Sequence, residues 1–200
     1  MLSDALVDAI VERPGVLPSL ICSSAGLGMI AWFSAGSLDW SRVYALFAAG
    51  GLALAVSVSL GRFGVNPIHP RLQISGCRMN SFSLDGDQQL LNFAMLAPFS
   101  FFATLATRRA WASFVASTLI SSAIEVTQNL TGVGVCELQD VLNNAGGAAL
   151  TAAVALAIDR VLSLHRKRMR YGRHACAPDR PAFKPGTTPI RSRQSMLARS

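Results

Sequence analysis

IEVTQNLTGVGVCELQDVLNNAGG, residues Ile124 to Gly147, is a polar break between two long apolar runs. Carboxylates and amides gather at its two ends: Glu125, Gln128, Asp140, Asn143 and Asn144. The short loop between those ends contains no Lys or Arg. The stretch therefore predicts two consecutive helices joined by a loop, with polar groups where the helices meet.

The composition of the whole chain indicates a lipid-facing protein. Its 200 residues are 51% hydrophobic and only 14% charged, and the mean hydropathy is +0.39. Soluble domains carry about 25% charged residues, so this chain lacks the polar surface that a water-facing globule needs. Eleven of the 18 Lys and Arg lie from Arg160 onward, so the net charge of +7 belongs mainly to a tail. This tail is predicted to be a cytoplasmic anchor at the membrane surface, and nucleic-acid binding is not expected.

Five apolar runs approach or reach the roughly 20 residues that a helix needs to cross a bilayer. They are residues 16–35, 43–60, 90–106, 110–128 and 141–164. No sustained strand alternation is present, which argues against a membrane barrel. The predicted fold is therefore all-α, a polytopic transmembrane helix bundle of about five spans.

Three segments follow from these runs. Residues 1–15 are acidic without a basic start, so they predict an N-terminal extracytoplasmic segment and no cleavable signal peptide. Residues 16–164 form the predicted transmembrane domain. Residues 165–200 form a predicted disordered basic cytoplasmic tail, because they are rich in Pro, Arg and Ser and poor in large apolar residues.

The orientation follows from the basic residues. The tail opens with HRKRMRYGRH after Leu164, and cytoplasmic segments carry an excess of Lys and Arg. Five spans then place the N-terminus outside and the C-terminus in the cytoplasm. Arg62, Arg71 and Arg78 fall in a long outer loop and run against this rule, but the tail outweighs them.

Two residues within the runs are expected to act on helix packing. Pro98 lies inside the third run, and the carbonyl that it frees is expected to be satisfied by Ser100, Thr104 or the interior of the bundle. Gly147 belongs to a small-residue stripe of the fifth run, which permits close helix approach in lipid.

The four cysteines suggest one bridge. Cys77 and Cys136 both fall in predicted outer loops, where disulfides persist. A Cys77–Cys136 disulfide would tie the long loop to the polar break, and two free thiols are the alternative. No His or Cys spacing indicates a metal site, and no cofactor is expected.

Glu125 is the first candidate for function. Counted from Ala110, it lies about 22 Å along a helix at 1.5 Å per residue, within the predicted hydrocarbon layer. An intramembrane carboxylate is a functional-site hypothesis by default, and a structural hydrogen bond is the alternative. Asp140 is suited to be the N-cap residue of the last span. That role does not account for the amide of Asn143, which lies on the same helix face as Asp140.

The predicted ligand-binding constellation opens to the outside and joins two span ends. Its members are Glu125, Gln128, Glu137, Asp140 and Asn143, with Asn92 at the start of the third span as a further member.

The last three runs resemble the VanZ-like family of bacterial membrane proteins. Asn92 to Ser100, NFAMLAPFS, resembles that family's Asn–apolar–Pro–x–Gly helix, with Ser100 where Gly is usual. Glu125 and Gln128 resemble its E-x-x-Q signature.

Residues 140–147 resemble the family's D-x-x-x-N-x-x-G signature, and this adds Asn144 to the candidate ligand-binding residues and gives Gly147 a marked place. The family often has an Arg in the loop before this signature, where this chain has Gly134. The resemblance implies an integral envelope protein, and the name-giving member is linked to resistance to the glycopeptide antibiotic teicoplanin.

Two functions remain open. The favoured one is a non-enzymatic envelope protein that binds a lipid-linked, sugar or glycopeptide ligand, since amides and carboxylates are good hydrogen-bond partners for such groups. The alternative is a membrane enzyme on a lipid-linked envelope substrate, with Glu125 and Asp140 as the acid/base pair. The expected partners are membrane lipids and an envelope lipid or glycopeptide ligand.

Overall fold

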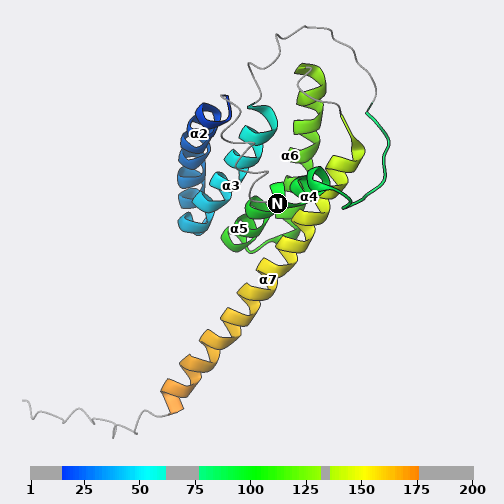
Figure 1. Ribbon diagram of the computed structural model, residues 1–200. Coiled ribbons are helices and arrows are strands. Elements are labelled where there is room, and N and C mark those ends of the chain that lie inside the picture. The colour runs from blue at the N-terminus through cyan, green and yellow to red at the C-terminus, as the bar shows by residue number, and fades with distance from the viewer. Residues whose placement is uncertain (1–14, 62–76, 132–135, 176–200) are drawn as a thin grey trace, which may run out of the picture. The chain divides into compact units, whose positions relative to one another are not determined.

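The computed structural model describes residues 15–61, 77–131 and 136–175, and these are almost entirely helical (Figure 1). The helices are α2 (Val16–Ser37), α3 (Arg42–Leu60), α4 (Asp87–Met95), α5 (Ala97–Thr107), α6 (Ala110–Thr131) and α7 (Leu138–Ala175). Helices α4 and α5 together make one span, so five helical segments are long and apolar enough to cross a membrane, judged by length and composition. The predicted all-α bundle of about five spans is confirmed.

The predicted runs start and end close to the helices except in α7. Helix α7 begins at Leu138 and continues to Ala175, eleven residues beyond the predicted span end at Leu164. The start of the predicted disordered tail is thus wrong, because residues 165–175 continue the helix. The predicted N-terminal segment up to residue 14, Gly134 and the tail from residue 176 lie outside the described residues.

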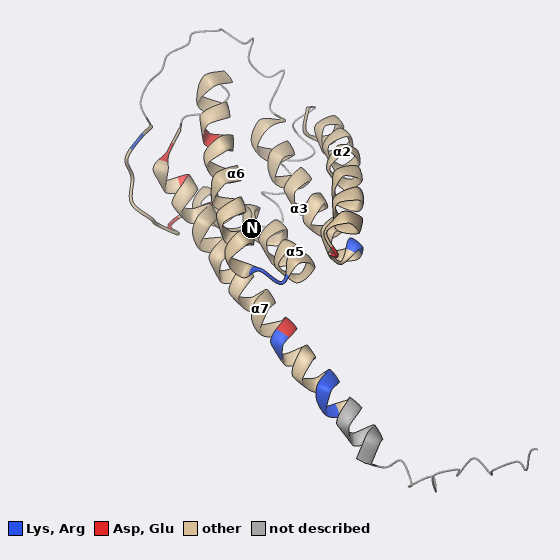
Figure 2. Ribbon diagram, turned by 180° about the vertical axis from the view of Figure 1, so that it is seen from behind, with Lys and Arg blue, Asp and Glu red and all other residues tan. Residues whose placement is uncertain are grey.

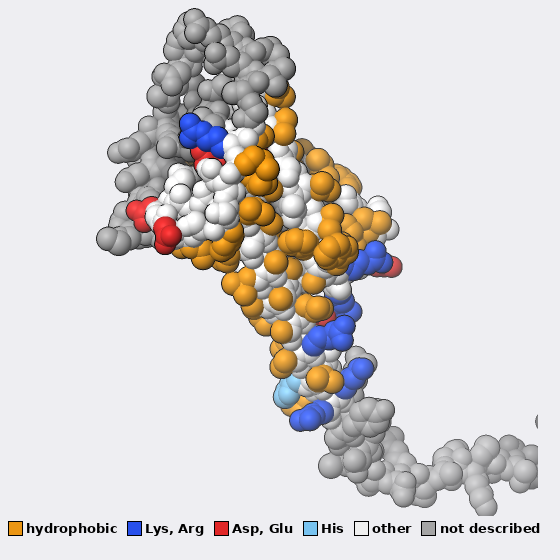
Figure 3. Space-filling view, turned by 90° about the vertical axis from the view of Figure 1, so that its right-hand side faces the viewer, with side chains coloured by type: hydrophobic (Ala, Val, Ile, Leu, Met, Phe, Trp, Pro, Cys, Tyr) orange, Lys and Arg blue, Asp and Glu red, His pale blue; other side chains and the backbone are white. Residues whose placement is uncertain are grey.

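The described residues as far as Leu162 belong to one compact unit, and its helices place large side chains outward and small ones inward. On α2, the side chains of Ile21, Met29, Ile30 and Phe33 are each more than 60% exposed. The buried apolar residues are mostly alanines, including Ala53 in α3 and Ala148 in α7. Figure 3 shows hydrophobic side chains spread over one face of the helices. Close approach over small residues is how helices pack when lipid, not water, surrounds them.

Gly51 and Gly147 mark two close approaches between helices. A Cβ at Gly51 of α3 would lie 2.8 Å from the backbone nitrogen of Phe99 in α5. A Cβ at Gly147 of α7 would collide with the carbonyl oxygen of Phe93 in α4. Helix α7 therefore lies backbone to backbone against α4, with no room for a side chain at Gly147.

The third span is broken between α4 and α5. Leu96 closes α4 and precedes α5, and Pro98 is the second residue of α5. At this position proline costs little, because the first amides of a helix have no intrahelical acceptor. The expected role of Ser100 and Thr104 is wrong: Ser100 Oγ donates to Ala148 O in α7 at 2.8 Å, and Thr104 Oγ1 has no hydrogen-bond partner among the described residues.

Candidate functional site

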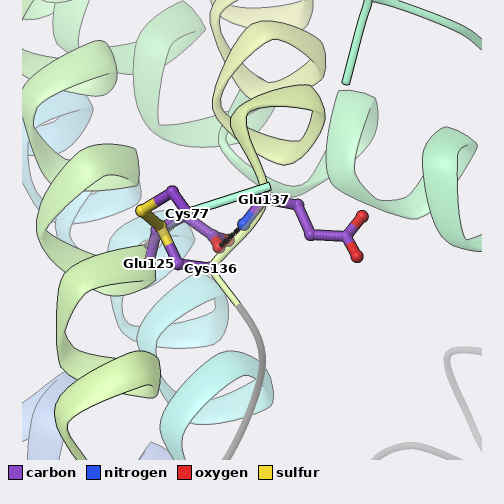
Figure 4. The surroundings of a disulfide bond; sticks show 4 residues. All are labelled: Cys77, Glu125, Cys136 and Glu137. Atoms are coloured by element: carbon purple, nitrogen blue, oxygen red, sulfur yellow. Dashed lines mark hydrogen bonds between the residues drawn. A yellow bond between two sulfur atoms is a disulfide. The ribbon is translucent and has the colours of Figure 1, made fainter. Parts of the chain in front are cut away.

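The disulfide between Cys77 and Cys136 joins two segments that are 59 residues apart in the sequence (Figure 4). Beside it, the N–H of Arg78 donates to Cys136 O at 2.9 Å, and the N–H of Leu138 donates to Arg78 O at 3.0 Å. This pairing fixes the loop before α4 against the start of α7. We call the end of the bundle at which α4 and α7 begin and α6 ends the disulfide end.

Glu125 lies on the buried face of α6. That face carries Ser113, Ser117 and Ser121 at four-residue spacing before Glu125, and all four side chains are buried. Residues four apart share one helix face, so the spacing itself turns Glu125 inward. Its Oε2 accepts a hydrogen bond from the backbone N–H of Glu137 at 3.1 Å, next to the disulfide (Figure 4).

Asp140 brings a second carboxylate to Glu125. It is the third residue of α7, so the N-cap interpretation is wrong, although the helix N-terminus still favours its charge. Asp140 and Glu125 lie close enough to interact electrostatically, and Glu137 interacts with both. Two of the predicted carboxylates thus come together inside the disulfide end.

Asn92 of α4 faces Asp140. Its side chain is directed at the Asp140 carboxylate, but Nδ2 completes no hydrogen bond of standard geometry. Its Oδ1 accepts from Gln88 Nε2 at 3.3 Å. Because Asn92 is buried, its amide group is held near the Asp140 carboxylate rather than in solvent.

Asn143 is the most unusual of the predicted residues. Its side chain is 0% exposed, and neither Nδ2 nor Oδ1 has a hydrogen-bond partner among the described residues. A buried polar group without a partner costs about 1–3 kcal/mol, and native proteins leave few of them. Asn143 lies one turn after Asp140 on the same face of α7. We call Asn92, Glu125, Asp140 and Asn143 the polar cluster.

Gln128 and Asn144 each contact a neighbouring helix. Gln128 Nε2 donates to Ser59 O at 3.0 Å, in the last turn of α3. Asn144 Nδ2 donates to Ser121 Oγ of α6 at 2.9 Å. Both predicted ligand-binding residues therefore make hydrogen bonds between helices, although Asn144 Oδ1 has no partner within the described part of the chain.

Glu137 lies at the rim rather than in the cluster. Figure 4 shows its carboxylate turned away from Glu125. Arg78 Nη1 lies 3.4 Å from Oε1 of Glu137, and Asn80 Nδ2 donates to its Oε2 at 3.4 Å. Sequence reasoning missed Arg78 and Asn80 as neighbours of the site. The sequence held a signal for Arg78, because it directly follows Cys77, and a disulfide from Cys77 to Cys136 was expected.

The carboxylates of the cluster and basic residues also lie at different ends of this unit. Glu125 and Asp140 lie at the disulfide end, with Arg78 near them, whereas Arg108 and Arg109 lie in the turn before α6, at the opposite end (Figure 2). Among the residues that the structure describes, no group of three or more His, Cys, Asp or Glu is placed to hold a metal ion. The chemistry of the cluster is that of carboxylates and amides.

Comparison with known proteins places the chain in a family. No curated protein and no solved structure matches it significantly. A family model described as VanZ/LLP1 matches residues 29–159, a range that contains the whole polar cluster and helices α3 to α6. With its five apolar helical spans the chain is a multi-pass membrane protein, and because this match covers more than half of its length, it belongs to the VanZ/LLP1 family.

Proposed function

We propose that the polar cluster is the ligand-binding site of a cell-envelope membrane protein. The ligand is the polar part of a lipid-linked, sugar or glycopeptide molecule, and the protein acts in envelope homeostasis or in glycopeptide antibiotic resistance. The observation that carries the proposal is Asn143. Its carboxamide is fully buried one helical turn after Asp140, and neither of its polar atoms has a hydrogen-bond partner among the described residues.

The depth of the cluster supports a site within the bundle. Asn92 and Asn143 each lie five residues from the start of their helices, and Glu125 lies six residues before the end of α6. At 1.5 Å per residue, each is about 8 Å inside the disulfide end. Three helices thus contribute polar groups at one level, where a ligand head group can hydrogen-bond to all of them.

The proposed orientation places the disulfide end outside the cell, with the N-terminus outside and the C-terminus in the cytoplasm. The basic residues of the tail favour this orientation, and a disulfide is expected in an oxidising compartment. A fluorescent reporter that folds only in the cytoplasm, fused after Ser200, should be bright. A dark fusion of normal abundance would show that the orientation is the opposite of the proposed one.

A membrane enzyme is the second candidate, because Glu125 and Asp140 are close enough to interact. Paired carboxylates can supply a general acid and a general base. Glu125→Gln separates the two functions: a binding protein keeps most of its affinity with a near-isosteric amide, whereas acid/base turnover collapses.

The binding test uses the purified full chain in detergent micelles. Fractionated envelope lipid extract and teicoplanin are the probes, applied to the wild-type protein and to Glu125→Ala and Asp140→Ala variants. We expect both substitutions to weaken binding at least about tenfold, which corresponds to 1.4 kcal/mol. Glu137→Gln is the matched control, because that carboxylate is turned away from the cluster. If the wild type and both alanine variants bind alike, the cluster is not the ligand site.

A further inference from the structure

We propose that residues 77–86, which we call the strap, form a lid over the polar cluster, and that the ring of Phe82 is the part of this lid that blocks access to Asn143. The inference rests on the proposed function, since it names what controls entry to the same site. The strap runs from Cys77, which is bonded to Cys136, to the start of α4 (Figure 1).

The strap meets α7 at two points. The N–H of Leu138, the first residue of α7, donates to Arg78 O at 3.0 Å. Farther along the helix, a Cβ added at Gly146 would lie 3.2 Å from Cε2 of Phe82 and 3.3 Å from Cε2 of Phe93 in α4. The ring of Phe82 therefore lies where α4 and α7 meet.

Asp140 and Asn143 lie between these two points on α7. Asn143 precedes Gly146 by three residues, so the two share a helix face. From Leu138 to Gly146 the helix rises about 12 Å, and an extended chain over residues 78–82 covers about 13 Å. The strap therefore runs beside α7 at the level of both cluster residues.

The burial of Asn143 requires that a neighbouring part moves before a ligand can reach it, because its side chain is 0% exposed. On the α6 side, Asn144 Nδ2 donates to Ser121 Oγ and joins two spans. On the α4 side, Gly147 lies directly against the backbone of Phe93. Both contacts join membrane spans, whereas the strap is a single surface segment. The strap is thus the neighbour that moves at least cost.

The strap is held firmly at one end and loosely along the rest. The disulfide fixes Cys77, but the side chains of Met79 and Phe82 are 82% and 50% exposed. Segments with exposed side chains and few packed contacts open locally at low free energy. At the far end, Gly86 has a φ of 111°, a conformation that favours glycine. Gly86 is therefore placed to act as the hinge of the lid.

Access to the cluster is measured with a reporter thiol introduced by Asn143→Cys. The full chain also carries Cys22→Ser and Cys176→Ser, so the native disulfide is kept and the reporter is the reactive thiol. N-ethylmaleimide, a small uncharged reagent, is added in detergent micelles, and its rate of reaction follows the population of the open lid. Phe82→Ala should raise this rate about three- to tenfold, because the closed lid loses the burial of half an aromatic side chain. Asn92→Cys is the second reporter, used if the first variant does not fold.

Two controls separate a lid from general packing. Met79→Ala removes an exposed apolar side chain from the same strap and should leave the rate unchanged. Ser117→Cys, in place of Asn143→Cys, puts the reporter at a fully buried position of α6 that is farther from the disulfide end. Phe82→Ala should leave the labelling of that position as slow as before.

The lid and the proposed function fail in different ways. An unchanged rate in Phe82→Ala, an equal rise in Met79→Ala, or an equal rise at Ser117→Cys overturns the lid, even if lipid extract or teicoplanin binds. Absence of binding by both of these probes overturns the proposed function, even if Phe82→Ala speeds labelling of the cluster.

Discussion

The backbone N–H of Glu137 donates a hydrogen bond of 3.1 Å to the buried carboxylate of Glu125. Glu137 directly follows Cys136, which is bonded to Cys77. The position of the hydrogen-bond donor to Glu125 therefore depends on a covalent link between two segments far apart in the sequence. The disulfide, which lies outside the membrane-spanning helices, therefore helps to fix the geometry of the polar cluster.

Loss of the disulfide should lower the stability of the protein. Cys77→Ser or Cys136→Ser removes a link that closes a long loop, and such links contribute about 2–4 kcal/mol. Thermal unfolding in detergent micelles should show a lower midpoint for either variant, and a similar drop for the wild type in reductant. Cys22→Ser is the control, because Cys22 is a free and exposed thiol. A variant with an unchanged midpoint would show that the link adds no stability.

Gly147→Ala should destabilise the bundle, because the added Cβ collides with the Phe93 carbonyl oxygen and must push α7 away from α4. Overpacking of this kind costs about 1–3 kcal/mol. Gly50→Ala is the matched control, since a Cβ there meets nothing within 4 Å and alanine favours a helix over glycine. Thermal unfolding should therefore show a lower midpoint for Gly147→Ala alone. Equal midpoints for the two variants would contradict the close contact between α4 and α7.

Gln128→Met should weaken the bundle without affecting ligand binding. The Gln128 side chain donates to Ser59 O, one of the last carbonyls of α3, and helices leave these groups without intrahelical donors. Removing such a hydrogen bond costs about 1 kcal/mol. The free energy of unfolding in mixed micelles measures this loss, and the binding assay above should give the wild-type affinity. A large loss of affinity at unchanged stability would show that Gln128 belongs to the ligand site.

The ion pair between Arg78 and Glu137 should contribute little to stability. The Arg78 side chain is 67% exposed and the two charged atoms are 3.4 Å apart, and exposed pairs contribute about 0.2–1 kcal/mol. A double-mutant cycle with Arg78→Ala and Glu137→Ala should give a coupling free energy in that range. It should fall further at high salt, because solvent ions screen exposed charges. A coupling well above this range would mean that the pair is shielded from water.

Much of the site could be predicted from spacing within single helices. The Ser113–Ser117–Ser121 series places Glu125 on the buried face of α6 by four-residue periodicity. The same argument fails for Gln128, because the neighbour that it contacts is the end of another helix. It also fails for Glu137, whose side chain turns to Arg78 because the loop pairing brings that residue beside it.

The sequence by itself determined the five helical spans, since their length and apolar content leave no other way to satisfy the backbone in lipid. It also determined which residues share a helix face, because that follows from 3.6 residues per turn. Only the tertiary structure decided which polar groups are paired. Contacts such as Gly147 on Phe93 and the Cys77–Cys136 bond fix how neighbouring helices rotate and approach. This packing gives Gln128 and Asn144 partners on other helices, and it leaves Asn143 without a hydrogen-bond partner among the described residues.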